Sequence, residues 1–418
     1  MTVELISVGT ELLMGNIVNT NAWYLSKKCA ELGFSLYFQV TVGDNEGRLC
    51  EVIRTALSRS DIVILTGGLG PTQDDMTKEA VSKVLNRELT MDETSKERIA
   101  SYFKFRFANS TVPQVITENN WKQALKIDGS MVVENDNGTA PGYIVEEEGK
   151  TVILLPGPPS ELLPMFDGHI FPYLGNKQDK VFVSNMVKIC GIGESRAETQ
   201  LLDLIESQSN PTIAPYAKDG EVHFRITASA SREEEAKELL KPVVDELFNR
   251  FGDNIYTTRE EETLEQVVVK LLQQKNYTVS TAESCTGGLL TGRLVNVSGA
   301  SDVLKEGFIT YSNEAKSKYL GVRQETLEAY GAVSEQTAAE MARGAVKAAG
   351  SDAALAITGI AGPDGGTQEK PVGLVYIACN VKGDINVKRF HFLGNRQKVR
   401  EQSIIYALDM LRRSLIHI

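Results

Sequence analysis

The sequence predicts an α/β protein built from three domains, and three observations lead to that prediction. The chain has 418 residues, which is long for a single hydrophobic core. Short apolar runs alternate with amphipathic helical segments up to about residue 170 and again from about residue 257, a rhythm typical of parallel sheets. The region between them has a small α+β pattern. We therefore expect domains at residues 1–170, 171–256 and 257–418.

Composition and charge exclude several classes of protein. Hydrophobic residues make up 42% of the chain and charged residues 24%, as in ordinary soluble globular proteins. A net charge of −11 argues against direct nucleic-acid binding as the main role. The five cysteines are scattered and form no C-x-x-C pair, which fits a reducing cytoplasm and no zinc site. Without a basic, apolar leader or an 18-residue apolar run, we expect a cytoplasmic protein with no signal peptide and no membrane span.

The first domain opens with an apolar run at Val3–Val8, which predicts a strand. A helix is expected next at residues 21–32, because Ala22, Leu25, Cys29 and Leu32 share one face. Since the pattern alternates, the strands should form a parallel sheet with their following loops at one edge. Further strands are expected at residues 36–42, 61–65 and 151–155, and further helices at 46–58, 75–85 and 93–107.

Three loops follow predicted strand ends in this domain, and ligands of open α/β sheets bind at that edge. The glycines after the third strand, together with Thr72, can cradle phosphates with their backbone N–H groups. Acidic side chains nearby are hard oxygen ligands suited to a divalent ion that bridges phosphates. The alternative for Asp74 and Asp75 is that one of them is a helix N-terminal charge. The candidate ligand-binding residues are Gly9, Thr10, Asn19, Asn21, Gly67, Gly68, Gly70, Thr72, Gly157, Pro158 and Glu161, and the candidate metal ligands are Glu11, Asp74 and Asp75.

The middle region carries weaker functional signals. Strands are expected at residues 181–190 and 223–229, helices at 195–205 and 233–250, and a hairpin-like turn at Lys218-Asp-Gly-Glu221. Its Gly191-Ile-Gly193 sequence is a lone G-x-G, for which a simple turn is the plain interpretation.

The third domain begins with a capping box, Thr263-Leu-Glu-Gln266, followed by an apolar helical stripe. Strands are expected at residues 277–281, 308–311, 353–357, 373–380 and 387–392, and helices at 334–349 and 396–415.

The run from Ala282 to Gly288, A-E-S-C-T-G-G, follows the first of those strands. A Ser or Cys at a strand end, followed by glycines, suits a nucleophile with backbone N–H donors for an oxyanion. Ser284 is the preferred nucleophile. Cys285 is the alternative, but a catalytic thiol usually needs a paired His or a strong positive field. We therefore interpret Cys285 as a small buried residue beside the site.

A nucleophile of this kind needs a base. The third domain has only His391 and His417, and their positions favour a structural or solvent-facing role. Lys316 is the candidate, because a partly desolvated lysine has a lowered pKa and can act as a base. Tyr311, five residues earlier, is the candidate proton relay or orienting group. An exposed surface lysine is the alternative interpretation of Lys316.

A second glycine loop, residues 358–367, follows the strand at residue 353 and matches neither a Walker nor a dinucleotide pattern. It is either a long surface loop or a place where the backbone approaches a ligand. Arg396 and Arg400 open the last helix and can pair with a phosphate, although surface arginine is the default. The substrate-binding candidates of this domain are Cys285, Thr286, Gly287, Gly288, Gly359, Ala361, Gly362 and Arg396.

These motifs resemble the competence/damage-inducible CinA family over essentially the whole chain. The first domain resembles its molybdopterin-binding-like three-layer domain through G-T-E-L-L-x-G from Gly9, N-T-N from Asn19, T-G-G-L-G-P-T-x-D-D-x-T from Thr66 and P-G-P-P-x-E from Pro156. The middle region is similar to the family's KH-like domain. The third resembles its nicotinamide-nucleotide amidase domain through A-E-S-C-T-G-G, Y-S-N-E-A-K from Tyr311 and the loop at 358–367.

The resemblance implies two activities. The third domain would hydrolyse the carboxamide of nicotinamide mononucleotide without a metal, with Ser284 as nucleophile and Tyr311 and Lys316 assisting. The first would be an ADP-ribose pyrophosphatase that uses Mg²⁺, Mn²⁺ or Co²⁺, with K⁺ as a further cofactor candidate. We also expect a homodimer and, from the competence association, protein partners in recombination or competence. Two alternatives stay open: a first domain that binds nucleotide or pterin without hydrolysis in a competence or DNA-repair accessory protein, and a molybdenum-cofactor enzyme.

Overall fold

A computed structural model describes residues 1–107, 116–218 and 220–418. The chain divides into two compact units, residues 1–182 with 229–233, and residues 183–228 with 234–418. The predicted α/β class is confirmed in both, since each contains a mixed sheet with a parallel centre. In the described ranges, no helix has the length and apolar character needed to cross a membrane.

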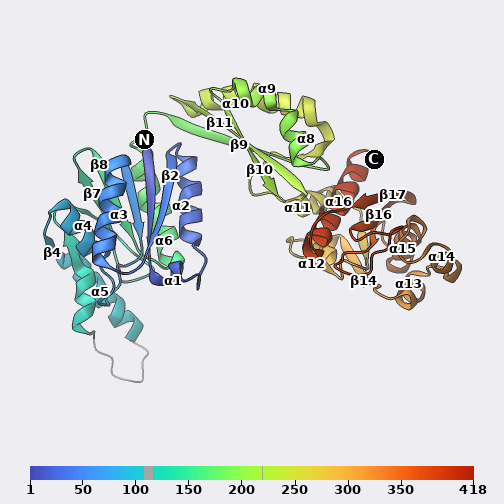
Figure 1. Ribbon diagram of the computed structural model, residues 1–418, viewed down its shortest axis with the longest axis horizontal. Coiled ribbons are helices and arrows are strands. Elements are labelled where there is room, and N and C mark those ends of the chain that lie inside the picture. The colour runs from blue at the N-terminus through green and yellow to red at the C-terminus, as the bar shows by residue number, and fades with distance from the viewer. Residues whose placement is uncertain (108–115, 219) are drawn as a thin grey trace. The chain divides into compact units, whose positions relative to one another are not determined.

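The first unit is built on a sheet of six strands: β1 (Thr2–Val8), β2 (Ser35–Val42), β3 (Ile62–Thr66), β6 (Met131–Val133), β7 (Gly142–Glu147) and β8 (Lys150–Leu155) (Figure 1). Their order is β2-β1-β3-β8-β7-β6, and the first four are parallel, as predicted. The register pairs Ser7 with Thr66 and Thr66 with Leu155. These strands therefore end level, and the loops after them leave the sheet at one edge.

Strands β6 and β7 are antiparallel to their neighbours, which the sequence prediction missed. Glu148 and Gly149 join β7 to β8, with φ of 48° and 81°. Two central residues at positive φ form the hairpin turn that matches the twist of antiparallel strands. This turn could not be recognised from the sequence, because its first position is a glutamate and the usual residue there is Asn, Asp or Gly.

Helices cover both faces of this sheet, giving three layers (Figure 1). Val3 and Leu5 pack with α2 (Thr20–Glu31) and α6 (Pro159–Met165), whereas Ile6 and Val8 pack with α3 (Glu46–Arg59) and α4 (Thr77–Leu85). This alternation follows from the two-residue period of a strand. The other elements are α1 (Thr10–Leu13), β4 (Leu89–Met91), α5 (Glu93–Phe107), η1 (Glu118–Ala124), β5 (Leu125–Ile127), η2 (Phe166–Ile170) and α7 (Phe171–Gly175).

The middle module has the sheet order β10-β11-β9-β12, with β9 (Val181–Cys190), β10 (Thr212–Lys218), β11 (Glu221–Ala230) and β12 (Ile255–Thr257). The helix predicted at residues 195–205 is instead two short helices, α8 (Glu194–Thr199) and α9 (Leu202–Ser207), followed later by α10 (Glu233–Phe251). Antiparallel pairing of Lys218 with Glu221 agrees with the predicted turn, of which Asp219 lies outside the described residues. Gly191 has φ 77°, as a tight turn requires.

The C-terminal part contains a sheet of five strands: β13 (Val279–Glu283), β14 (Leu304–Ile309), β15 (Ala353–Gly359), β16 (Leu374–Val381) and β17 (Asp384–His391). Their order is β14-β13-β15-β16-β17; the first three are parallel and the last two antiparallel. The strand predicted at 308–311 lies earlier in the chain, so Tyr311 follows it. Glu283 pairs with both Ile309 and Ile357, and the ends of β13 and β14 are therefore adjacent.

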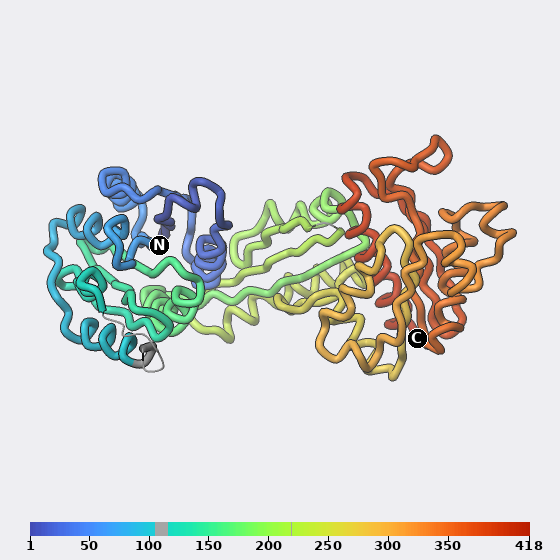
Figure 2. Tube along the Cα trace, turned by 90° about the horizontal axis from the view of Figure 1, so that it is seen from below, coloured from blue at the N-terminus to red at the C-terminus, as the bar shows by residue number. Residues whose placement is uncertain are grey.

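Helices again pack on both faces of this sheet. One core includes α15 (Glu335–Ala349), and the other includes α11 (Leu264–Lys275) and α16 (Arg396–Ile416). Helix α16 lies against β15 and β16; it is the red end of the trace in Figure 2. The capping box of Thr263 and Gln266 is confirmed at the start of α11. The remaining elements are η3 (Gly252–Asn254), α12 (Leu289–Val295), η4 (Ala300–Asp302), α13 (Asn313–Leu320) and α14 (Gln324–Tyr330).

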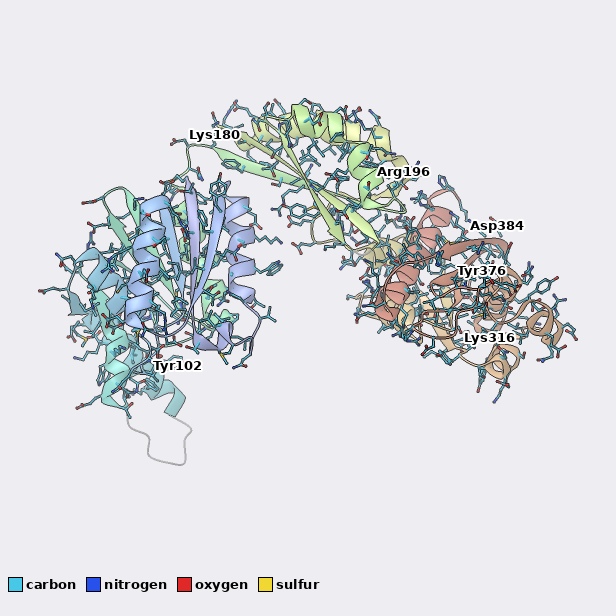
Figure 3. The ribbon with its side chains drawn as sticks, viewed as in Figure 1. Tyr102, Lys180, Arg196, Lys316, Tyr376 and Asp384 are labelled. Atoms are coloured by element: carbon cyan, nitrogen blue, oxygen red, sulfur yellow. The ribbon has the colours of Figure 1, made fainter. Side chains whose placement is uncertain are left out.

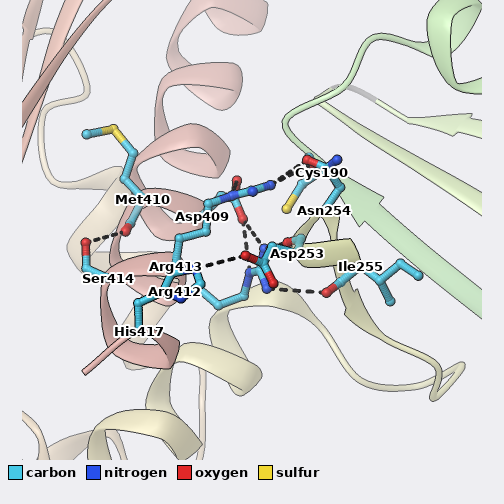
Figure 4. A network of polar contacts seen from close by, with 10 residues as sticks. All are labelled: Cys190, Asp253, Asn254, Ile255, Asp409, Met410, Arg412, Arg413, Ser414 and His417. Atoms are coloured by element: carbon cyan, nitrogen blue, oxygen red, sulfur yellow. Dashed lines mark hydrogen bonds and ion pairs between the residues drawn. The ribbon is translucent and has the colours of Figure 1, made fainter. Parts of the chain in front are cut away.

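A buried polar network joins the end of α16 to the middle module (Figure 4). Arg412 is 3% exposed and donates from Nε and Nη2 to Asp409 Oδ1 at 3.0 and 2.6 Å. It also donates to the backbone carbonyls of Asp253 and Ile255. Arg413 donates to the other oxygen of Asp409 at 2.7 Å. These bonds fix α16 to residues 253–255, the segment that connects the middle module to the C-terminal part.

Candidate active site

Ser284 occupies the first position after β13. Its backbone N–H donates to the carbonyl of Ile357 at 3.0 Å, which extends the pairing of β13 with β15 by one residue. Gly287 and Gly288 then turn the chain with φ of 58° and 93° before α12 begins. A side chain in that left-handed region is strained, which explains both glycines. Ser284 is 8% exposed, so its hydroxyl lies in a nearly enclosed position.

Lys316 is brought to this hydroxyl by α13. Ser312 caps the helix by accepting from the N–H of Ala315 at 3.1 Å, and Lys316 follows in its first turn. The side chain is 1% exposed, in the interior of the C-terminal part (Figure 3). Its Nζ donates to Ser284 Oγ at 3.1 Å, and to the carbonyls of Thr310 at 2.8 Å and Tyr311 at 3.3 Å.

Burial lowers the pKa of Lys316 to about 8, because the charged form is desolvated. The neutral amine can keep its two N–H bonds to the carbonyls of Thr310 and Tyr311 and turn its lone pair toward Ser284. Lys316 is thus in reach of the Oγ proton and can lose its own proton near neutral pH.

Cys285 is the other candidate nucleophile. It is 6% exposed, and burial raises the pKa of its thiol to about 11. The two histidines of this domain, which the sequence analysis interpreted as structural or solvent-facing, have other contacts: His391 Nε2 lies 3.1 Å from the carbonyl of Val372, and His417 pairs with Asp253 at 2.8 Å. At neutral pH the thiol is protonated, which agrees with a packing role.

Two backbone donors remain available beside Ser284. Of the four substrate-binding candidates after Ser284, two have their N–H groups bonded within the loop: that of Gly287 donates to the carbonyl of Ser284, and that of Gly288 to the side chain of Glu283. The N–H groups of Cys285 and Thr286 have no partner in another residue of the described chain. The N–H of the residue after the nucleophile is one of the oxyanion donors in α/β-hydrolases, and Cys285 holds that position here, with Thr286 next to it.

Tyr311 lies differently from the expected relay. Its side chain is 64% exposed, and only its backbone carbonyl contacts Lys316. Thr310, which sequence inspection missed, contributes the shorter contact through its carbonyl. The sequence would have indicated this contact only if the last residue of β14 had been known, because the carbonyls that hold Lys316 lie between that strand end and α13.

Two arginines near the start of α16 bond to both glycine loops of this domain. Arg396 donates from Nη1 to the carbonyl of Gly362, and Arg400 from Nη2 to that of Thr286, both at 2.8 Å. A Cβ on Gly359 would lie 2.8 Å from the carbonyl of Leu374, and one on Gly362 2.5 Å from a Val372 methyl. Close packing therefore accounts for these glycines. Ala361 is buried in the same loop.

The first unit has its own candidate site, a cavity of about 440 Å³ at the carboxyl edge of its sheet. All three predicted loops contribute to its wall, which confirms that they meet. A Cβ on Gly67 would lie 2.3 Å from the carbonyl of Val8, so this loop packs on the end of β1 without room for a side chain. The predicted residues that line the cavity are Gly9, Glu11, Gly67, Gly68, Gly70, Asp74, Asp75, Gly157, Pro158 and Glu161.

Four of the predicted residues support the loops from outside the cavity wall. Asn19 accepts from the N–H of Ala22 as the N-cap of α2, and Asn21 donates to the carbonyl of Gly157 at 2.7 Å. The hydroxyl of Thr10 donates to Asp44 at 2.8 Å. Thr72 donates its N–H to Asp75 Oδ2 at 2.9 Å and its hydroxyl to the same atom.

Asp44, Asn135 and Gln123 were missed. Asp44 follows β2 and could have been found by the same-edge rule that found the other loops. Asn135 donates to Glu161 at 2.7 Å and comes from a segment after β6, a strand that was not predicted. Burial raises the pKa of Glu161, so its proton is held more firmly than that of a surface glutamate.

Whether this cavity can hold a metal ion depends on its acidic side chains. No group of three or more His, Cys, Asp or Glu side chains in the described residues lies close enough to hold an ion. Glu11, Asp74 and Asp75 all line the cavity but do not form such a group. One or two carboxylates suffice for Mg²⁺ when substrate phosphates and water complete its shell, so the donor set fits an ion that arrives with a phosphorylated substrate.

Comparison with known families covers nearly the whole chain. Residues 4–176 match the model described as "Probable molybdopterin binding domain", residues 184–257 the "Damage-inducible protein CinA KH domain", and residues 261–415 the "CinA C-terminal domain".

Full-length relatives are similarly clear. A CinA-like protein from Dictyoglomus turgidum is 51% identical over 418 residues, covering 100% of both chains. Another from Kosmotoga olearia is 51% identical over 416 residues, covering 100% of this chain and 99% of the relative. A solved structure, the competence/damage inducible protein CihA from Agrobacterium tumefaciens, is 43% identical over 37% of this chain and 93% of its own, with a TM-score of 0.36.

Proposed function

The chain belongs to the CinA family, with a molybdopterin-binding-like first domain, a KH domain and a CinA C-terminal domain, and on that premise we propose that it is a nicotinamide-nucleotide amidase. The observation that carries the proposal is the 3.1 Å contact between Ser284 Oγ and the buried amine of Lys316. Nicotinamide mononucleotide as the substrate comes from the family resemblance of the motifs that contain these residues.

The reaction begins with neutral Lys316. Its Nζ takes the Oγ proton as Ser284 attacks the carboxamide carbon, and the negative charge that develops on the carbonyl oxygen is met by the N–H groups of Cys285 and Thr286. Collapse of this intermediate breaks the C–N bond, and Lys316 returns the proton to the departing nitrogen, which leaves as ammonia.

An acyl ester on Ser284 remains. Lys316, neutral again, takes a proton from a water molecule that attacks the ester carbon. The C–Oγ bond then breaks and Oγ recovers a proton from Lys316. Nicotinate mononucleotide is formed as the acid and passes its proton to the released ammonia, which gives a carboxylate and an ammonium ion. One water is consumed for each ammonia released. Lys316 can serve both steps because its Nζ lies 3.1 Å from Ser284 Oγ, the atom that carries the acyl group.

The test is a product balance on the full chain. Purified protein with nicotinamide mononucleotide should release ammonia and nicotinate mononucleotide in equal amounts, and Ser284→Ala should remove both. Wild-type protein that releases neither product, or a Ser284→Ala variant as active as the wild type, would contradict the proposal.

We propose a second activity, metal-dependent hydrolysis of ADP-ribose, for the cavity of the first unit. It is supported by the meeting of a glycine loop with carboxylates at the ligand-binding edge of the sheet. One or two of the carboxylates of Glu11, Asp74 and Asp75 would hold a divalent ion together with the substrate phosphates, and such an ion, when bound, would polarise a phosphoryl oxygen. Glu161, oriented by Asn135, can take a proton from water at the same wall.

The alternative for this cavity is nucleotide or pterin binding without hydrolysis. Incubation with ADP-ribose, with and without Mg²⁺, Mn²⁺ or Co²⁺, separates the two. Release of AMP and ribose 5-phosphate supports the pyrophosphatase. Calorimetric binding of ADP-ribose or a pterin without product supports the binding role.

A further inference from the structure

Glu283, the residue before the nucleophile, has a completely buried carboxylate. Its Oε2 accepts from the backbone N–H groups of Gly288 and Leu290, both at 3.0 Å. Its Oε1 accepts from the N–H of Thr291 at 2.8 Å and from the Thr291 hydroxyl at 2.6 Å. Four donors thus surround one carboxylate.

No lysine or arginine in the described part of the chain pairs with this carboxylate. Burying a charge without a counter-ion is costly unless hydrogen bonds replace its hydration. The first turn of α12 supplies such bonds, since its backbone N–H groups have no partners within the helix. Charge-assisted bonds of this kind are about twice as strong as neutral ones.

Other helices of this domain are capped in a simpler way. Thr263, Ser312, Ser334 and Asn395 each accept one backbone N–H from the N-cap position. The N-cap residue of α12 is Gly288, which has no side chain. The capping group comes instead from Glu283, across the segment that contains the nucleophile.

The consequence is a closed loop around Ser284. Glu283 is fixed by β13 at one end, and its carboxylate is bonded to Gly288, Leu290 and Thr291 at the other. The residues between them, including Cys285 and Thr286, have little freedom to turn. The same carboxylate occupies the N–H of Gly288, so the unpaired donors of the loop are those of Cys285 and Thr286.

We propose that Glu283 is the positioning residue of the oxyanion site, holding the N–H groups of Cys285 and Thr286 at fixed places beside Ser284 Oγ, a role that rests on the proposed amidase function. Glu283 acts through the loop and does not touch the substrate. Its loss should lower kcat and leave KM nearly unchanged, because the oxyanion exists only in the transition state and intermediate.

Glu283→Gln is a sharp test because it keeps the shape of the side chain. An amide NH₂ in the place of Oε2 would face the N–H groups of Gly288 and Leu290, and in the place of Oε1 it would face the N–H of Thr291 beside a hydroxyl that can turn to accept. In either place at least one backbone N–H loses its acceptor. The loop must then shift. We expect kcat for deamidation to fall by about 10²-fold, the usual cost of losing one oxyanion donor.

A second readout does not depend on the natural substrate. A fluorophosphonate reacts with an activated serine: the Oγ–P bond forms, the P–F bond breaks, fluoride leaves, and the Oγ proton passes to Lys316. The phosphoryl oxygen occupies the oxyanion position during this step. Labelling of Ser284, measured by mass spectrometry with Ser284→Ala as the blank, should slow by a similar factor in Glu283→Gln.

Asp352→Asn is the matched control. Asp352 also accepts a backbone N–H and a hydroxyl, both from Thr278 at 2.8 and 2.9 Å, but at the opposite end of β13. Its variant should lose stability and keep the labelling rate within about threefold. Thr291→Val, which removes one donor and keeps the carboxylate, should slow labelling by a smaller factor than Glu283→Gln.

These measurements distinguish a failure of the proposed amidase function from a failure of the positioning role of Glu283. Rapid labelling of Ser284 in a wild type that does not deamidate the nucleotide would refute the substrate assignment, and the labelling ratio would still decide on Glu283. Equal labelling rates in wild type and Glu283→Gln would overturn the positioning role. If Glu283→Gln does not fold, Thr291→Val decides: an unchanged kcat and labelling rate would overturn the role.

Discussion

Lys316 and Ser284 are 32 residues apart in the sequence, yet Nζ and Oγ lie 3.1 Å apart in the interior of the C-terminal part. The contact follows from the parallel pairing of β13 and β14, which ends both strands at one edge. A buried amine and a hydroxyl at this distance can exchange a proton without a histidine, as the proposed amidase mechanism requires. The chemistry of the pair leads to several measurable consequences.

The pH dependence of deamidation should follow Lys316. The charged amine cannot accept the Oγ proton, and burial lowers its pKa to about 8, so kcat/KM should rise through that pH and level off above it. Lys316→Arg should be inactive over the same range, because guanidinium stays protonated. Lys318→Arg, an exposed neighbour on α13, is the control. A flat profile between about pH 6 and about pH 10 would contradict the assignment.

Cys285 should be dispensable. Because the pKa of its thiol is raised to about 11, the thiolate is scarce at neutral pH and alkylation by iodoacetamide should be slow. Cys285→Ala should keep kcat within about tenfold, whereas Ser284→Ala should lower it by about 10³-fold or more. If Cys285→Ala were the inactive variant and Ser284→Ala active, the enzyme would use a thiol mechanism.

Tyr311→Phe should be mild. The phenol is 64% exposed, and the group that contacts Lys316 is the backbone carbonyl, which the substitution keeps. We expect kcat/KM to stay within about fivefold of the wild type when it is measured at a pH above the pKa of Lys316, where the amine is neutral. A loss of kcat/KM close to that of Ser284→Ala would show that the Tyr311 hydroxyl takes part in proton transfer.

Much of the site could be predicted because it depends on strand ends. Ser284 and Gly67 directly follow strands whose apolar runs are plain in the sequence, and parallel pairing then fixes which loops meet. The orientation of Tyr311 could not be predicted, since the strand before it ends two residues earlier than expected. Glu283 gave no signal, because a carboxylate inside a buried strand is explained only by donors that fold back from the next helix.

The first unit shows the same limit. Its parallel centre was predicted, but the hairpin that brings Asn135 to Glu161 depends on the turn at Glu148 and Gly149. The part of the site that comes from the segment after β6 could therefore be identified only once the structure was known.

The two proposed activities should respond differently to chelation. EDTA should abolish ADP-ribose cleavage and leave deamidation unchanged, because the Ser284 mechanism uses only side chains and backbone N–H groups. Asp75→Asn should lower only the first activity, by about 10²-fold if the carboxylate holds the ion. Asp136→Asn, an acid paired with Arg98 outside this cavity, is the control. Equal loss of both activities on chelation would contradict separate chemistries.

The C-terminal part should fold as an isolated fragment, and its stability should depend on where the fragment starts. Arg412 donates to the carbonyls of Asp253 and Ile255 and forms a buried pair with Asp409. A fragment that starts at Arg250 keeps both carbonyls, whereas one that starts at Thr257 leaves the buried guanidinium short of acceptors. We expect the shorter fragment to fold but to be about 1–3 kcal/mol less stable in urea.

The same network gives an internal check on that difference. In the longer fragment, Arg412→Ala should cost about 3–5 kcal/mol, because it leaves the Asp409 carboxylate buried with a single partner, Arg413. In the shorter fragment the same substitution should cost less, since Arg412 has already lost its carbonyl partners. Urea unfolding of the four proteins forms a cycle that isolates the contribution of residues 250–256 to the pair. If Arg412→Ala lowers the free energy of unfolding equally in the two fragments, Arg412 is held by Asp409 alone. A fragment that starts at Thr257 would then lose no stability.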